Sequence, residues 1–300
     1  MKYLTVFLCS FHCLFASSFM TEDFVKGKEL SEGYHLPMAL IFTGSDWSDP
    51  SKKLLEGLDK SPCKEIIFVH VDFPELNVQS QAILQKNHAL KKEYSVHSFP
   101  TVVLLDADSK EITRLGYPTL DTVDFVGFLT SIERRYALLK HRFKKAQHVL
   151  SAPELLYCFH EARDLGALDL TQEIVDFGAL HQLSSELLLE KYMTLLGTGQ
   201  TEDAEALRHL LLKEENQETQ SRLALLDFQE HASIKPLEAF LETYGQDQGE
   251  RFWKIHLVMS EFFLENNQKI EALEHAQVSY RHAPQEDKAY ISNLISKMSH

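Results

Sequence analysis

The apolar pattern of this chain changes near residue 148, and that change limits its fold more than any other feature. Before it, short apolar runs at residues 38–42, 66–72 and 101–106 alternate with stretches of helical periodicity. Such alternation predicts an α/β domain with a central mixed sheet and flanking helices. After it, glycine and proline are sparse and leucines recur at helical spacing, which predicts an all-helical region.

Individual elements follow from the same pattern. In the first half, helices are expected at residues 49–58 and 79–94 and from residue 122 onward, and residues 111–116 should pair with 101–106 as a hairpin. In the second half, short polar turns separate nine expected helices, which should pack as antiparallel neighbours. These helices are expected at residues 153–165, 170–181, 185–196, 201–213, 219–230, 236–244, 250–266, 269–282 and 286–298.

The first 18 residues have the pattern of a signal peptide. Lys2 precedes an apolar stretch at residues 3–15, and Ala16-Ser17-Ser18 supplies small residues for cleavage. This predicts an exported protein, periplasmic or secreted, with mature residues beginning at Phe19. Two alternatives stay open: a buried strand, or a start at Met20 that leaves the protein in the cytoplasm. No later stretch is long and apolar enough to predict a transmembrane helix.

Charge is divided unevenly along the chain, whose formal net charge is −14. Residues 19–148 carry 17 Lys and Arg against 18 Asp and Glu, whereas residues 149–300 carry 12 against 26. This distribution argues against nucleic-acid binding. The acidic half is either a well-solvated helical surface or a surface for a cationic partner.

Six Lys and Arg residues gather at residues 133–147, in the last expected helix of the first half. They are compatible with a solvated connecting helix, whose cations favour its C-terminal end. An anion or membrane-surface site is a second interpretation. A third is that these cations hold the acidic half in place.

The segment most informative about chemistry is Phe42-Thr-Gly-Ser-Asp-Trp47-Ser48-Asp49-Pro50-Ser51, which follows an expected strand and opens an expected helix. A second mark is Ser98-Phe99-Pro100-Thr101, directly before another strand. Together they resemble the thioredoxin family, and especially its exported, disulfide-isomerase-like branch with a Gly-Ser-Asp-Trp motif. The resemblance covers roughly residues 35–132, so the expected domains are a leader at 1–18, a thioredoxin-like domain at 19–148 and a helical domain at 149–300.

The resemblance implies a Cys-x-x-Cys pair at the helix N-terminus, where the helix dipole lowers the pKa of the attacking thiol. Here Ser48 and Ser51 hold both positions, so the resemblance implies no catalytic residue, no redox activity at this place and no cofactor. A cis peptide before Pro100 is also implied. The buried Asp that the family often has six residues before the first cysteine is Phe42 here.

Two interpretations of this motif stay open. Ser48 or Asp49 is a good N-cap and Pro50 suits the first helical position, so the segment is explained as a helix start alone. Alternatively, the family's groove persists and binds a polypeptide or protein partner. The residues assigned to such binding are Trp47, Ser48, Asp49, Pro50, Ser51, Phe99 and Pro100.

Cysteine usage sets the main alternative function. Cys9 and Cys13 fall in the leader, and Cys63 and Cys158 remain either as one bridge or as two buried thiols. The first hypothesis is a non-redox, chaperone-like or scaffold protein. The second is a divergent thiol–disulfide isomerase or oxidoreductase that uses Cys63 or Cys158. In a third, the helical half alone is the scaffold.

One stretch of the second half, residues 251–284, resembles a tetratricopeptide repeat. Phe263, Ala272 and Pro284 have the spacing of that repeat, and Ser260 and Ser279 are small where two helices must approach. Residues 194–213, around Ala204, resemble a poorer copy. An irregular helical bundle is the alternative.

Metal chemistry is not predicted. The fifteen histidines are scattered, and the pairs His141/His148 and His275/His282 share helix faces without a cysteine or carboxylate to complete a zinc-like cluster.

Overall fold

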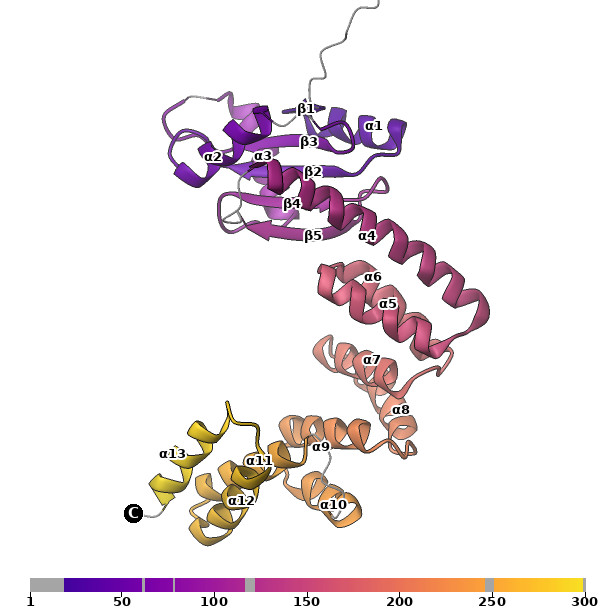
Figure 1. The fold of residues 1–300 in the computed structure, drawn as a ribbon, viewed down its shortest axis with the longest axis vertical. Helices are drawn as coiled ribbons and strands as arrows, with labels where there is room; N and C mark the ends of the chain where they lie inside the picture. The colour runs from indigo at the N-terminus through magenta and orange to yellow at the C-terminus, as the bar shows by residue number, and fades with distance from the viewer. Residues whose placement is uncertain (1–18, 61–62, 78, 117–121, 246–250, 299–300) are drawn as a thin grey trace, which may run out of the picture. The chain divides into compact units, whose positions relative to one another are not determined.

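A computed structural model describes residues 19–60, 63–77, 79–116, 122–245 and 251–298. They form two compact units, one ending at Ile174 and the other beginning at Val175. The first unit contains a sheet with helices and the second contains helices alone (Figure 1). The expected leader at residues 1–18 lies outside the described residues.

Among the described residues, the sheet has five strands in the order β1-β3-β2-β4-β5. Strand β3 pairs in parallel with β1 and β2, whereas β4 is antiparallel to β2 and β5 is antiparallel to β4. The predicted mixed sheet and its hairpin are therefore confirmed. The strands are β1 (Met20–Thr21), β2 (Met38–Thr43), β3 (Ile67–Asp72), β4 (Thr101–Leu105) and β5 (Glu111–Gly116).

Strand β2 lies at the centre of the sheet, and all six of its residues are buried. Alternate side chains of a strand point to opposite faces. On one face, Met38 and Leu40 join a core cluster with Leu90, against which Phe24 and Leu30 pack. Helices α1 (Phe24–Tyr34) and α3 (Gln81–Glu93) therefore cover that face.

Helix α4 (Thr122–Val149) lies across the sheet in Figure 1 and contacts α2 (Asp49–Lys60). It extends beyond the sheet and packs against α5 (Ala152–Leu165). The sequence-based boundary after residue 148 falls at the turn between α4 and α5, where strands give way to helices only. The first compact unit continues past it because α5 packs on α4.

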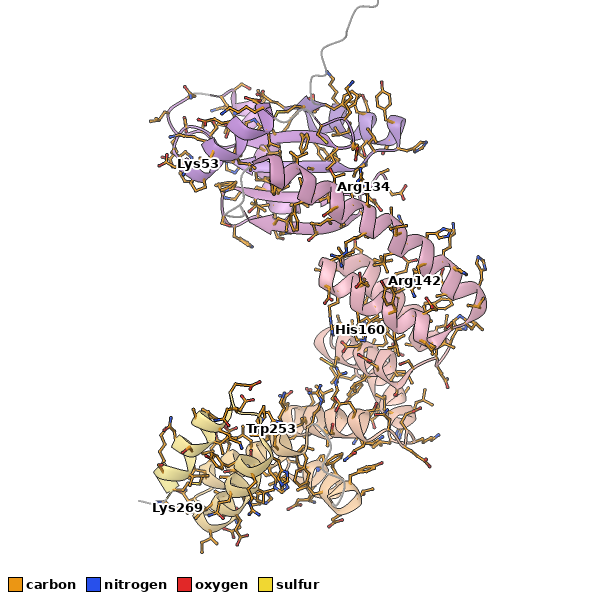
Figure 2. The ribbon with its side chains drawn as sticks, viewed as in Figure 1. Lys53, Arg134, Arg142, His160, Trp253 and Lys269 are labelled. Atoms are coloured by element: carbon orange, nitrogen blue, oxygen red, sulfur yellow. The ribbon has the colours of Figure 1, made fainter. Side chains whose placement is uncertain are left out.

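Ion pairs connect α4 with its neighbours. Arg142, labelled in Figure 2, lies 2.6 Å from Glu154 of α5, and Arg135 lies 3.0 Å from Glu161 of the same helix. Arg134 and Lys140 pair with carboxylates near the sheet. Four of the six clustered cations thus bind carboxylates within the first unit, and two of those carboxylates lie beyond residue 148.

The all-helical region predicted after residue 148 is confirmed, and its nine expected helices correspond one to one with helices α5–α13 of the described residues. None of the described helices is long and apolar enough to cross a membrane. After α5, the helices are α6 (Leu168–Leu180), α7 (Ser185–Gly197), α8 (Thr201–Leu211), α9 (Gln217–His231), α10 (Lys235–Tyr244), α11 (Phe252–Glu265), α12 (Lys269–His282) and α13 (Lys288–Met298).

Helices α11 and α12 approach closely because small residues line their contact. Ser260, Ala272 and Ser279 are fully buried. The Ser260 hydroxyl donates to the Ala272 carbonyl at 2.8 Å, and the Ser279 hydroxyl donates to the Trp253 carbonyl at 2.9 Å. The small-residue contact expected from the sequence is therefore present. Membership of the tetratricopeptide class stays a prediction.

A buried ion pair connects α8 and α9. The Arg208 guanidinium donates to both carboxylate oxygens of Asp227, at 2.7–3.1 Å. Asp227 is only 3% exposed, and Tyr192 of α7 also donates to it at 3.4 Å. A buried charge is costly unless it is paired, and here the pairing joins side chains of three helices, α7, α8 and α9.

Candidate functional site

The candidate site begins where β2 ends and the chain turns into α2. The backbone N–H groups of Trp47 and Ser48 both donate to the Gly44 carbonyl, at 3.3 and 2.8 Å. A Cβ at Gly44 would overlap the Trp47 indole. Glycine is thus required here by the close approach of the indole to the backbone, and this turn sets the position of Trp47.

Both serines at the expected cysteine positions are engaged with backbone. The Ser48 hydroxyl accepts from the Ser51 N–H at 3.4 Å, the bond an N-cap residue makes to the third helical residue. The Ser51 hydroxyl accepts from the Gly44 N–H at 3.3 Å. Ser48 is 6% exposed and Ser51 is fully buried. The two hydroxyls therefore stabilise the turn and the first turn of α2.

Asp49 and Pro50 are the first two residues of α2 and are exposed. Asp49 pairs with Lys52 one turn later, at 3.4 Å. Ser48 is thus the N-cap, and Pro50 occupies the second helical position, one residue later than expected. The first turn of a helix tolerates proline because its N–H groups lack intrahelical partners.

The peptide bond between Phe99 and Pro100 is cis, as the resemblance implies. Pro100 is buried, and the loop is closed by the Thr101 hydroxyl, which donates to the Ser98 carbonyl at 2.7 Å. Phe99 meets Trp47 edge to face, with ring centroids 6.0 Å apart. The structure therefore brings together the two motifs that are 52 positions apart in the sequence.

A third aromatic ring completes this surface. Phe73, directly after β3, stacks on Phe99 at 5.0 Å, and the Trp47 Nε1–H donates to the Phe73 carbonyl at 2.9 Å. Trp47 nevertheless remains 43% exposed. Because the polar edge of the indole is already satisfied, its exposed part is mainly apolar. We call Trp47, Phe73 and Phe99 the aromatic surface.

Helix α3 adds basic groups to the aromatic surface. The Lys91 ammonium lies 5.0 Å from the Phe99 centroid and 5.6 Å from that of Phe73, within cation–π range. His88 meets Phe73 edge to face at 5.3 Å. Sequence reasoning missed Phe73, His88 and Lys91. The available signals were the aromatic residue that ends an apolar strand and the three-residue spacing of His88 and Lys91 on a helix.

Asp46 fixes the loop that follows Phe73. Its carboxylate accepts the backbone N–H groups of Glu75, Leu76 and Asn77 at 2.7–2.9 Å. Desolvation acts to raise the pKa of Asp46, but these N–H groups outweigh it and the pKa is lowered. The Asp46 charge is therefore already compensated by backbone.

A polar network lies at the ends of β2 and β3, beneath the turn. The Thr43 hydroxyl lies 2.7 Å from both His70 Nε2 and Asp72 Oδ1. Asp72 also accepts the N–H and the hydroxyl of Ser45. Burial lowers the pKa of His70, although Asp72 opposes it. Since Thr43 is fully buried, this network supports the turn and offers no accessible nucleophile.

The two remaining cysteines are buried in separate places. Cys158 lies in α5 as a free thiol, and burial raises its pKa to about 11. Cys63 follows the C-terminal end of α2. Twelve helical residues at about 1.5 Å each place that end roughly 18 Å from Ser48. No disulfide joins Cys158 to Cys63.

Within the described residues, no group of three or more His, Cys, Asp or Glu side chains is arranged to hold a metal ion.

The fold and the turn that precedes α2 define the class of domain to which the first half of the chain belongs. Residues 28–125 match the family model of the thioredoxin-like domain. The first unit therefore contains a thioredoxin-like domain, followed by helices that lie outside the match.

The chain is homologous to two proteins of Chlamydia pneumoniae. It is 28% identical over 303 aligned positions to the thioredoxin-related protein DsbJ, covering 93% of this chain and 86% of that protein. It is 37% identical over 108 positions to the disulfide bond reductase DsbH, covering 34% of this chain and 65% of that protein. A solved structure of a DsbH oxidoreductase is 30% identical, covers 39% of this chain and 86% of its own, and has a TM-score of 0.35.

Proposed function

We propose that this chain binds an extended segment of another polypeptide across the aromatic surface, without thiol–disulfide exchange at that place. One contrast carries the proposal. Ser48 and Ser51 are buried and bonded to backbone, whereas Trp47 beside them is 43% exposed and apolar on its open face. The domain keeps an exposed surface for a chain but has no thiols at the positions that would attack one.

The basic groups at this surface suggest the chemistry of the partner. Lys91 lies over Phe73 and Phe99, and Asp46, the nearby carboxylate of the turn, is compensated by three backbone N–H groups. A segment that places an apolar side chain on Trp47 and a carboxylate near Lys91 would complement both. We therefore propose an acidic, apolar segment as the partner.

Binding is tested with fluorescent peptides that combine aromatic and acidic residues, titrated against the full mature chain. Trp47→Ala should weaken binding at least several-fold, because a partly exposed aromatic anchor is lost. Tyr280→Ala, at a residue 40% exposed in the second unit, is the matched control and should bind normally. Equal affinities for both variants would refute the aromatic surface as the binding site.

Lys91→Met tests the charge preference, because it keeps most of the apolar side chain and removes the charge. Affinity for acidic peptides should fall up to about fivefold, the range of an exposed ion pair, while neutral peptides bind unchanged. Lys92→Met on the same helix is the control.

The homology with DsbH favours a second candidate, a thiol–disulfide oxidoreductase. The buried Cys158 argues against it, since the thiolate is the nucleophile and burial raises the pKa of this thiol to about 11. An insulin-reduction assay on the mature chain separates the two. We expect no turnover above background, and turnover that disappears when Cys63 and Cys158 are both changed to Ala would establish the oxidoreductase instead.

A further inference from the structure

Helices α11 and α12 meet at two histidines beside their small-residue contact; Trp253 on α11 and Lys269 at the start of α12 locate this pair of helices in Figure 2. His256 of α11 and His275 of α12 place their Nδ1 atoms 2.8 Å apart. His256 also contacts Phe252 at 4.5 Å between centroids, and His275 stacks on Phe263 at 5.4 Å. Both imidazoles are thus partly buried among aromatic rings.

A contact between two Nδ1 atoms limits the charge that the pair can carry. One nitrogen must donate its proton and the other must accept through a lone pair. The pair meets this condition when both rings are neutral, or when one is charged and donates to its neutral neighbour. When both rings are charged, two N–H groups face each other, so the hydrogen bond is lost and like charges repel.

Neighbouring groups act differently on the two rings. Burial lowers the pKa of His275, but Glu274 of α12 and Glu238 of α10 oppose this effect and favour its charged form. His282 of α12 disfavours charge on His256. His275 is therefore the first of the two rings to be protonated, and the second proton must bind His256.

We infer that the His256–His275 contact is a proton-sensitive switch between α11 and α12, closed while the pair carries at most one positive charge and opened when both imidazoles are charged. Desolvation, then His275 and His282, lower the pKa of His256 to about 4 from an ordinary 6.5. A group whose pKa is lowered by folding stabilises the fold above its ordinary pKa, and the stability is lost as pH falls toward the folded value. Acidification through this window should therefore loosen α11 and α12.

Hydrogen exchange on the full chain tests the switch, with rates corrected for the intrinsic effect of pH. Between about pH 6.5 and pH 4, from the ordinary pKa of His256 down to its value in the folded chain, amides of α11 and α12 should lose protection several-fold. His256→Gln/His275→Gln keeps side chains that can hydrogen-bond but cannot charge, so its protection should stay constant. His97→Gln, at an exposed histidine of the first unit, should behave like the wild type.

A direct titration covers the case in which the double variant fails to fold. Imidazole nitrogen shifts of the wild type should show His275 charging before His256, with His256 still neutral near pH 5. Two rings that both titrate near their ordinary pKa would overturn the switch. So would an equal loss of protection in the double variant and the wild type.

Discussion

Ser51 shows, at the scale of one residue, what a serine does at a position where the family resemblance implies a cysteine. Its fully buried hydroxyl accepts the Gly44 N–H, and a sulfur atom would be a much weaker acceptor. Serine at this position is therefore a structural residue of the turn, which is the helix-start interpretation, although the adjacent aromatic surface remains available for binding. The two interpretations of the motif are compatible because they concern different atoms.

We expect Ser51→Ala to lower the free energy of unfolding by about 1–2 kcal/mol, since it leaves a buried backbone N–H without a partner. Unfolding of the first unit in urea measures the change in this free energy. Ser109→Ala is a matched control, because the buried Ser109 hydroxyl lacks a hydrogen-bond partner among the described residues. Equal losses in the two variants would contradict the role given to Ser51.

Asp46→Asn should release the loop at residues 75–77, because a neutral amide oxygen accepts the three N–H groups less strongly than a carboxylate. Hydrogen exchange at those amides should rise. The pKa of Asp46 is lowered from 3.8, so the stability that this carboxylate supplies is present above that value and lost as pH falls below it. Unchanged exchange at residues 75–77 would argue against this anchor.

At the scale of elements, sequence reasoning succeeded where a single pattern dominates. The sequence predicts that strand β2 is buried because each of its residues is apolar or small. Helix α2 begins where Ser48 and Asp49 predict an N-cap. Helix α1 was missed because Gly27 and Gly33 interrupt its apolar periodicity. Strand β1 was missed because two residues are too few for any pattern.

The candidate site was only half predictable for a similar reason. Trp47 and Pro100 stand in motifs that resemble a known family, so they were found. Phe73 and Lys91 carry no motif; Phe73 belongs to the aromatic surface, and Lys91 lies over it, only because β3 and α3 end there. Their local signals, an aromatic residue at the end of a strand and a three-residue spacing on a helix, do not indicate which surface they reach, because tertiary contact decides that.

The pairing of α8 with α9 gives an element-scale prediction. Asp227→Ala should lower the stability of the second unit by about 3 kcal/mol, because Arg208 is left partly buried without its carboxylate. Asp203→Ala, on the exposed face of α8, should cost little. Thermal unfolding followed by circular dichroism would detect the difference, and similar melting temperatures for both variants would show that Arg208 finds another partner.

At the scale of the whole molecule, the expectation of export rests on the signal-peptide pattern of residues 1–18 alone. When the full sequence is expressed in a bacterium with an outer membrane, we expect the mature chain in the periplasm or the medium, beginning at Phe19. Mass spectrometry of the intact protein gives its N-terminus directly. A cytoplasmic product that begins at Met1 or Met20 would contradict this expectation. A cationic partner for the acidic helical half remains a proposal at the same scale.

The chain has two tryptophans, and each compact unit contains one of them. Trp47 is partly exposed with its N–H fixed on Phe73, whereas Trp253 is buried in α11. Their fluorescence emission maxima should therefore differ, and each should report on its own unit. Trp253→Phe would leave one optical probe at the aromatic surface, where quenching by an added peptide gives occupancy without any attached label.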